Sequence, residues 1–173
     1  MGFVETIKHN FGHYADFRGR AQRSQFWWWY LFVIIVQGVL TAVESALGLQ
    51  IGKSEGDVTV GDTTIPVVSS GVGVLSTLFA LAILLPTLAV AVRRLHDTDR
   101  TGWWIIAPAL AYVAAGVAVA IAIAAGAGVF VLALLGIGFL VAFILAIVLR
   151  VFYIQKGTAG PNRYGPDPLG QGA

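Results

Sequence analysis

The feature that most constrains the fold of this chain is a series of four long apolar stretches, at about 26–49, 72–95, 103–125 and 129–153. An α-helix needs about 20 consecutive apolar residues to cross the hydrocarbon core of a bilayer, and each stretch is long enough. Apolar residues make up 57% of the 173 residues and charged residues only 12%. A soluble domain of this size could not bury so much apolar surface. The sequence therefore predicts an all-α integral membrane protein with four transmembrane helices in a single membrane domain.

Basic side chains gather in three of the segments outside these stretches. Ten of the eleven lysines and arginines lie in residues 1–25, around the connection between the second and third spans, or near the C-terminal end. Lys53 is the exception, in the polar connection 50–70. Because lysine and arginine concentrate on the cytoplasmic side of a membrane, we expect both termini in the cytoplasm, with segment 1–25 and tail 154–173.

Residues 1–17 have the pattern of an amphipathic helix. Apolar side chains recur at helical spacing on one face, at Phe3, Val4, Ile7, Phe11 and Tyr14. Polar side chains occupy the opposite face, at Glu5, His9, His13 and Asp16. Two interpretations are open, an interfacial helix lying flat among the headgroups and a short helix packed on the protein's own cytoplasmic side.

The first span combines an aromatic start with one polar face. Ser24 is a plausible N-cap, and the aromatic run Phe26–Tyr30 follows it as an anchor at headgroup level. Gln37, Thr41 and Glu44 share one face of the helix, which we expect to turn toward the other helices. Glu44 lies roughly 27 Å from the start of the span, so we expect its carboxylate to reach water at the far surface. The alternative is a buried functional carboxylate.

The later spans carry a proline and two small-residue repeats. Pro86 should bend the second span, and Thr87 is a candidate to satisfy the carbonyl that the proline frees. Only a very short turn separates the third and fourth spans, which both have small residues at every fourth position: Gly116, Ala120 and Ala124, then Gly138, Ala142 and Ala146. Such spacing predicts a close antiparallel hairpin.

The remaining connections contain turn signals. In the 50–70 connection, Val58–Val60 and Thr63–Ile65 flank Gly61-Asp62, a pattern that predicts a small β-hairpin. The C-terminal tail is rich in glycine and proline, so we expect it to be extended or turn-like.

The central stretch Arg93–Trp104, RRLHDTDRTGWW, holds the densest group of charges between two apolar runs. Charge is excluded from the bilayer core, so a charged stretch that ends in paired tryptophans belongs at the membrane surface. We expect this stretch to be the cytoplasmic loop that joins the two halves of the protein.

Three segments carry a resemblance to a known family. They are YADFRGRAQRSQFWWW (14–29), PTLAVAVRRLHDTDRTGWW (86–104) and GPNRYGPDP (160–168). They stand in the order usual for the family, and the match extends over nearly the whole chain. In these segments the chain resembles a bacterial inner-membrane family known as domain of unknown function family 805. The resemblance implies a small multi-pass protein of the bacterial inner (plasma) membrane. It implies no activity, substrate or catalytic residue.

The polar residues of these segments allow two main interpretations. In the first, Asp16, Asp97 and Asp99 form ion pairs with arginines, and Asn162 and Tyr164 clamp the tail over them. The other members of this structural cluster are Arg18, Arg20, Arg23 and Arg163. In the second, the central stretch binds an anion such as a phosphate or an anionic lipid headgroup, through Arg93, Arg94, His96, Asp97, Arg100, Trp103 and Trp104.

Three further hypotheses each rest on a single feature of the sequence. His96 could act as a general base oriented by Asp97 or Asp99, but no nucleophile accompanies it. A metal could bind His9 and His13, with Asp16 as a third ligand. The polar face of the first span could line a pore in an oligomer.

We therefore expect a non-enzymatic inner-membrane scaffold or lipid-associated protein with no catalytic residue, metal or cofactor. The expected partners are membrane lipids, with a second copy of the chain or another membrane protein as open alternatives, and nucleic acid is not expected.

Overall fold

The structure is a computed structural model that describes residues 1–52, 54–60, 63–69 and 71–170. A short helix, α1 (Phe3–Gly12), precedes four long helices: α2 (Arg23–Leu47), α3 (Val74–Asp97), α4 (Ala107–Ala124) and α5 (Gly128–Ile154). All four long helices are long and apolar enough to cross a membrane. The predicted all-helical fold with four apolar spans and a short N-terminal helix is confirmed.

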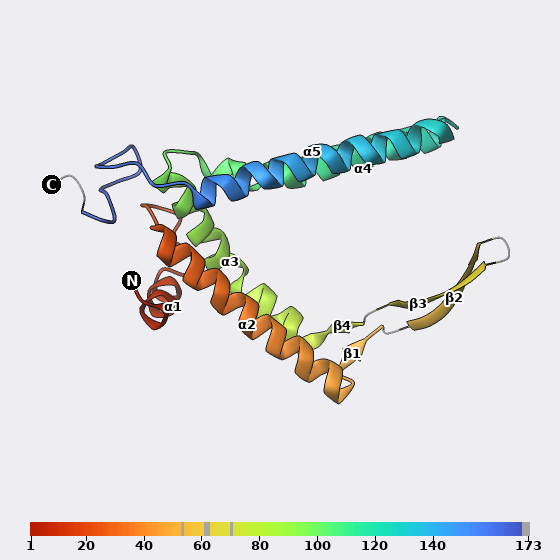
Figure 1. Ribbon diagram of the computed structural model, residues 1–173, viewed down its shortest axis with the longest axis horizontal. Coiled ribbons are helices and arrows are strands. Elements are labelled where there is room, and N and C mark those ends of the chain that lie inside the picture. Colours follow the sequence, from red (N-terminus) through yellow and green to blue (C-terminus); the bar gives the residue numbers. More distant parts are fainter. Residues whose placement is uncertain (53, 61–62, 70, 171–173) are drawn as a thin grey trace.

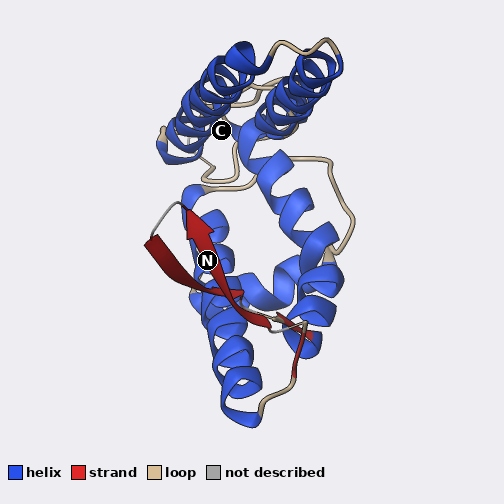
Figure 2. Ribbon diagram, turned by 90° about the vertical axis from the view of Figure 1, so that its right-hand side faces the viewer, coloured by secondary structure: helices blue, strands red, loops and turns tan. Residues whose placement is uncertain are grey.

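The long helices form two antiparallel hairpins, α2 with α3 and α4 with α5 (Figure 1). The hairpins meet at the end of the molecule that carries α1 and the C-terminal tail, and they splay apart toward the other end (Figure 1), which faces the viewer in Figure 2. Within an apolar 18-residue stretch of α3, 33% of the residues are buried inside the protein, against 6% in the corresponding stretch of each of the other three long helices. The central helix is therefore α3, and most apolar side chains of the others face outward, where lipid can cover them.

Helix α1 packs against α2, as the second of the two interpretations predicts. Phe3 lies edge-on to Trp28 with ring centroids 5.7 Å apart, and Phe11 lies edge-on to Trp29 at 5.3 Å. The most buried side chains of α1 are polar, however: Thr6 and Asn10 are fully buried, whereas Phe11 is 44% exposed. The packed face is therefore rotated from the apolar stripe, and the helix ends at Gly12 rather than near residue 17.

Pro86 lies inside α3 and is fully buried. A proline cannot donate to the carbonyl four residues before it, which here is that of Ala82. The hydroxyl of Tyr14, from the segment after α1, donates to this carbonyl. The prediction that Thr87 fills this role is wrong: among the described residues its hydroxyl makes no hydrogen bond to the Ala82 carbonyl, and it accepts one from the indole N–H of Trp29 (3.1 Å).

Glu44 joins the two helices of the first hairpin at the end far from the chain termini. Its side chain is fully buried, and Oε1 accepts hydrogen bonds from the backbone N–H groups of Leu75 and Ser76 (3.1 Å for Ser76) at the start of α3. The expectation that Glu44 reaches water is wrong. The first N–H groups of a helix lack intrahelical partners and carry partial positive charge. They therefore stabilise the carboxylate inside the protein, although its position along α2 alone would place it near water.

The polar face expected on α2 is divided. Glu44 turns toward α3, but Thr41 is exposed, and Gln37 and Thr41 both line a shallow groove on the outer surface of α2. Three residues correspond to about 300° of helical rotation, so Thr41 is turned by about 60° from Glu44 and leaves the contact face. The expectation that all three side chains turn inward is therefore wrong for Thr41.

The close α4–α5 hairpin is confirmed, but only one of the two small-residue repeats makes it. A Cβ added to Gly138 would clash with the Cβ of Ala115, and Ala142 is fully buried. Gly116 has no atom within 4 Å of an added Cβ, so its repeat faces outward. The contact face of α4 instead contains Ala115, next to Gly116 in the sequence, and Ala122. These alanines pack where α5 has its smallest side chains.

Several boundaries differ from those predicted. The N-cap of α2 is Gln22, without a side-chain hydrogen bond, and Ser24 lies inside the helix. Helix α4 begins later than expected because the 3-10 helix η1 (Gly102–Ile105) precedes it.

The connection between α2 and α3 holds two antiparallel strand pairs. β1 (Gln50–Ile51) pairs with β4 (Val72–Gly73), and β2 (Ser54–Val60) pairs with β3 (Thr63–Ser69). The predicted hairpin strands are confirmed. The expected turn at 61–62, like Lys53, lies outside the described residues.

Candidate functional site at the C-terminal end of α3

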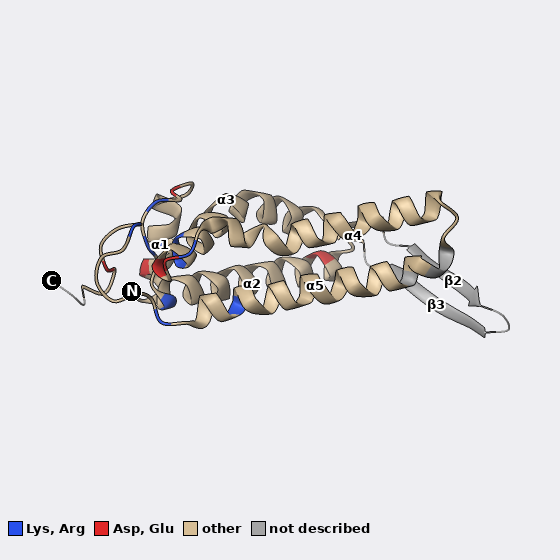
Figure 3. Cartoon of the chain, turned by 90° about the horizontal axis from the view of Figure 1, so that it is seen from above, with Lys and Arg blue, Asp and Glu red and all other residues tan. Residues whose placement is uncertain are grey.

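Charged residues gather at the end of the molecule that carries both chain termini, whereas the rest of each long helix holds few of them (Figure 3). The four polar residues Arg93, Arg94, His96 and Asp97 of the central stretch belong to the last turns of α3 and not to a loop. The connection to η1 is only 98–101. The helix continues because its last turns are held by contacts from the N-terminal segment and the tail, which the local sequence does not reveal.

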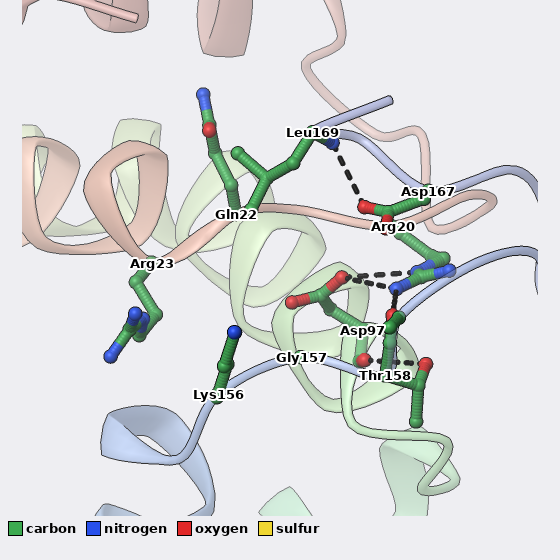
Figure 4. Close-up of a pocket in the computed structure, with 10 residues that line it drawn as sticks. Arg20, Gln22, Arg23, Asp97, Lys156, Gly157, Thr158, Asp167 and Leu169 are labelled. Atoms are coloured by element: carbon green, nitrogen blue, oxygen red, sulfur yellow. Dashed lines mark hydrogen bonds and ion pairs between the residues drawn. The ribbon is translucent and has the colours of Figure 1, made fainter. Parts of the chain in front are cut away.

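Asp97 is the centre of the site and joins three segments of the chain (Figure 4). Oδ1 accepts from Nε (3.0 Å) and Nη2 (2.9 Å) of Arg20, in the segment between α1 and α2. Oδ2 accepts from Nη1 of Arg94 on α3 itself. The backbone carbonyl of Asp97 accepts from the N–H (2.9 Å) and the hydroxyl (3.2 Å) of Thr158 in the tail. The side chains of all three charged residues are no more than 5% exposed, so the pairs are desolvated.

Arg94 also ties the C-terminal end of α5 to the site. Its guanidinium donates to the backbone carbonyls of Tyr153 (3.1 Å), Gln155 and Ala21 (3.4 Å). The last carbonyls of a helix lack intrahelical donors and carry partial negative charge, so a buried cation is well placed there. Arg94 is fully buried, and its hydrogen bonds to the protein leave it unavailable to an external anion.

Arg93 is buried too, but its neighbours are neutral. Nη2 donates to the side-chain carbonyl of Asn10 (3.1 Å), and Nη1 lies 3.4 Å from Nε2 of His9. Its backbone carbonyl accepts from the N–H of Ala21 (3.0 Å). Among the described residues no carboxylate pairs with Arg93 within 4.0 Å, and 4% of the residue is exposed. Arg93 therefore fastens α1 to α3.

His96 is covered by the tail. The ring of Tyr164 stacks on the imidazole with centroids 3.8 Å apart and planes 3° apart. Nδ1 of His96 lies 3.2 Å from the carbonyl oxygen of Gly19, and the backbone carbonyl accepts from the amide of Asn162 (2.9 Å). One ring nitrogen and one ring face are thus occupied by the protein, which argues against a general base poised for an external substrate.

Other residues predicted for the site lie at its margin. Asp16 accepts from the backbone N–H of Arg18 (3.0 Å). Asp99 pairs with Arg163 at 3.0 Å, and both side chains are about half exposed. Such an exposed pair contributes little stability. None of these residues reaches Asp97 among the contacts that the described residues make.

The expected tryptophan anchor also lies at the margin. The guanidinium of Arg100 lies 3.9 Å above the ring of Phe152, and Trp104 lies edge-on to the same ring at 5.2 Å. Trp103 is 75% exposed. These side chains cover the end of α5 and leave one indole free to contact lipid.

Four residues that the sequence did not single out complete the site. Lys156, Gly157, Thr158 and Asp167 line a cavity of about 30 Å³ together with Arg20, Arg23 and Asp97 (Figure 4). That space admits about two water-sized groups. A Cβ on Gly157 would clash with the carboxylate of Asp97, so only glycine permits this approach of the tail. The glycines and prolines of the tail were the feature of the sequence that could have indicated its close approach to α3.

Asp167 is held in its charged form. Its carboxylate accepts hydrogen bonds from the backbone N–H groups of Leu169 (2.9 Å) and Gly160 (3.1 Å). The hydrogen bond from Leu169 is the largest cause that holds the pKa of Asp167 below its ordinary value, with further contributions from Gly160, Arg20 and Lys156.

The two histidines in and directly after α1 do not converge on a metal-binding geometry. The rings of His9 and His13 stack with centroids 4.1 Å apart, and the Arg93 guanidinium lies beside His9. Burial, followed by the charges of His13 and Arg93, lowers the pKa of His9. Within the described part of the chain, no group of three histidine or acidic side chains could hold a metal ion.

Comparison with known proteins gives a consistent assignment. Residues 14–166 match the family described as "Protein of unknown function (DUF805)". The chain is 34% identical to the inner membrane protein YhaH of Escherichia coli K12 over 166 residues, which cover 96% of this chain and 94% of that protein. It is 34% identical to the inner membrane protein YhaI of the same strain over 156 residues, 90% of this chain and 88% of that protein. No solved structure matches the chain.

Proposed function

This chain belongs to the DUF805 family and is a multi-pass protein of the bacterial inner membrane, and we propose that it acts there as a non-enzymatic scaffold. In this proposal the polar cluster around Asp97 locks the N-terminal segment, α3 and the tail into one rigid surface. That surface lies in the cytoplasm and is what a partner or the membrane contacts.

The observation that carries the proposal is the use of the buried cations. Arg20 and Arg94 donate to Asp97 and to backbone carbonyls, and Arg93 donates to Asn10. A site built for a substrate would keep donors free for the reacting group, whereas here the protein itself occupies them. This supports a structural role for the residues that the anion hypothesis had assigned to a ligand.

The test of the lock compares two aspartates. Asp97→Asn should release the tail, so trypsin should cleave after Lys156 and Arg163 much faster than in the wild-type protein in membrane vesicles. Asp99→Asn is the matched control, because the Asp99–Arg163 pair is exposed and should not hold the tail. Equal cleavage of wild type and Asp97→Asn would contradict the proposal, as would turnover of a phosphoester that His96→Gln abolishes.

The scaffold itself is tested by cross-linking in intact membranes. A protein partner cross-linked to the wild type should be lost from Asp97→Asn and kept by Asp99→Asn. A partner retained equally by both variants would show that the locked surface is not the one that is recognised.

The cytoplasmic orientation is part of the proposal and has its own test. The chain has no cysteine, so a single one can be introduced and labelled. In intact cells, a membrane-impermeant maleimide should label Ile51→Cys, at the far end of α2, and spare Thr101→Cys. The reverse pattern would invert the topology.

Phosphate binding is a second candidate, favoured by two cations beside the cavity. Arg23 and Lys156 are exposed and lie on the side of the cavity away from the Arg20–Asp97 pair (Figure 4). Neither forms an ion pair within the described residues. If this candidate holds, calorimetry with inorganic phosphate or glycerol phosphate should show binding that Lys156→Gln weakens. Absence of heat with both ligands would exclude it.

A further inference from the structure

A second surface of interest lies on the membrane side of the protein, between the N-terminal half of α2 and the C-terminal half of α5. It is a groove of about 260 Å³, and it is separate from the polar cluster. Its lining is largely aromatic and aliphatic with one cation: Phe26, Trp27 and Tyr30 of α2, and Ala146, Leu149 and Arg150 of α5.

The position along the two helices gives the depth of the groove. α2 begins at Arg23 and α5 ends at Ile154, at the end of the molecule where both chain termini lie (Figure 1). At 1.5 Å per residue, Arg150 lies about 6 Å from the end of α5, and Tyr30 lies about 10 Å from the start of α2. The groove therefore begins at headgroup depth and continues into the region of the acyl chains.

Arg150 is the unusual member of this lining. It is exposed, lies inside a membrane-spanning helix, and makes no hydrogen bond or ion pair with the residues that the structure describes. A cation at that depth is costly unless it meets an opposite charge or reaches the headgroups. The partner that the bilayer offers at this depth is the phosphate of an anionic phospholipid.

The apolar part of the groove has a fixed floor and open walls. Phe26 is buried and packs against Tyr153 with ring centroids 4.4 Å apart. Trp27 and Tyr30 are 40% and 46% exposed, so their rings are available to line a chain. Ala146 is the smallest side chain of the lining and leaves space next to them. An aliphatic chain would contact aromatic surfaces along its length.

We propose that this groove binds one anionic phospholipid. The guanidinium of Arg150 donates hydrogen bonds to the phosphate, and one acyl chain lies between α2 and α5 against Phe26, Trp27 and Ala146. The cation and the apolar groove together select an amphiphile with a negative headgroup. The inference does not depend on the scaffold proposal, because none of its residues contacts Asp97 among the described interactions.

The experiment uses the full chain in a mild detergent, titrated with phosphatidylglycerol or phosphatidylcholine and examined by native mass spectrometry. The wild type should retain one phosphatidylglycerol in preference to phosphatidylcholine. Arg150→Gln should weaken phosphatidylglycerol binding about tenfold, as expected for loss of a charge-assisted hydrogen bond. Arg18→Gln is the control, because Arg18 is an exposed cation outside the groove.

A second variant tests the acyl chain without a change of charge. Ala146→Leu should fill the groove and also weaken binding, whereas Ala120→Leu, on an exposed face of α4, should not. Unchanged helical circular dichroism would show that each variant is folded. Equal lipid retention by wild type and Arg150→Gln would overturn the proposal. Loss with Arg150→Gln but not with Ala146→Leu would also overturn it, by showing a headgroup contact without a seated chain. A dimer that fills the groove in place of lipid would overturn it as well.

Discussion

The two ends of α3 are each held by a buried carboxylate, but by different physical means. At the end near the chain termini, Asp97 is paired with two guanidinium groups from two segments. At the far end, Glu44 accepts from two backbone N–H groups of the first turn of α3, and its Oε2 atom is buried with no partner among the described residues. The first end depends on full charges, whereas the second depends on the partial charges of a helix terminus.

The two contacts therefore differ in how many segments of the chain they hold together. The Asp97 cluster joins segments that are far apart in the sequence, so its loss should free several of them together. The Glu44 contact joins two helices that are already adjacent, so its loss should be more local. Four predictions test this comparison, in order of decreasing effect on stability.

Replacement of Asp97 should have the largest effect. Asp97→Ala leaves the guanidiniums of Arg20 and Arg94 buried without their carboxylate, and removing one partner of a buried pair costs about 3–5 kcal/mol. The free energy of unfolding can be measured by titrating the detergent-solubilised protein with sodium dodecyl sulfate. Asp99→Ala, which removes an exposed pair, should cost no more than about 1 kcal/mol. Similar losses in both variants would remove the distinction between buried and exposed pairs.

Replacement of Glu44 should rank second. Glu44→Ala removes the acceptor for two N–H groups at the start of α3 and should cost about 1–3 kcal/mol in the same titration. Glu44→Gln keeps one acceptor oxygen and should cost less. If Glu44→Ala proves more harmful than Asp97→Ala, the ranking of the two ends is reversed.

The two carboxylates are each approached by a glycine, which gives a matched pair of variants. A Cβ at Gly157 would clash with Asp97, and one at Gly73 would clash with Glu44. Gly157→Ala and Gly73→Ala should each lower stability by about 1–3 kcal/mol, the typical cost of overpacking. Gly12→Ala, with no atom within 4 Å of the added Cβ, should leave the unfolding midpoint unchanged or slightly higher. A neutral Gly157→Ala would mean that the tail can shift without disturbing Asp97.

The pH dependence should give the smallest effect, and it is tested here with His9 and Asp167, which both lie at the end near the chain termini. The pKa of His9 is lowered from 6.5 in the folded protein, mainly by burial. Below pH 6.5 the unfolded chain therefore binds a proton that the folded chain does not, and stability falls as the pH decreases. His9→Gln should remove only the share of this pH dependence that His9 contributes, so the profile between pH 5 and 7 should become shallower. The contribution of Asp167, whose pKa is lowered from 3.8, is lost only as the pH falls below that value, so the two windows are separable. A profile identical in wild type and His9→Gln between pH 5 and 7 would contradict the assignment.

How far the sequence predicts the site depends on the kind of contact. The pairing of Arg20 with Asp97 joins two opposite charges in recognisable motifs, and sequence reasoning included both residues in the cluster. The hydrogen bonds of Arg94 to the carbonyls of Tyr153 and Gln155 could not be anticipated, because every residue has a carbonyl and nothing in the sequence marks which ones lack a donor. The same reason explains the misjudged Glu44, whose partners are backbone N–H groups.

The four apolar helices, the close hairpin of α4 and α5, and the concentration of charge at the ends of the spans could all be predicted from the amino-acid sequence. These properties follow from length, hydrophobicity and side-chain size, which act locally along the chain. Three other properties follow only from the way the helices pack: which acceptor each buried cation binds, which face of α1 is covered, and which donor hydrogen-bonds to the carbonyl freed by Pro86. In a desolvated site every polar group needs a partner, and the partner is set by which segments the packed helices bring together rather than by neighbours in the sequence.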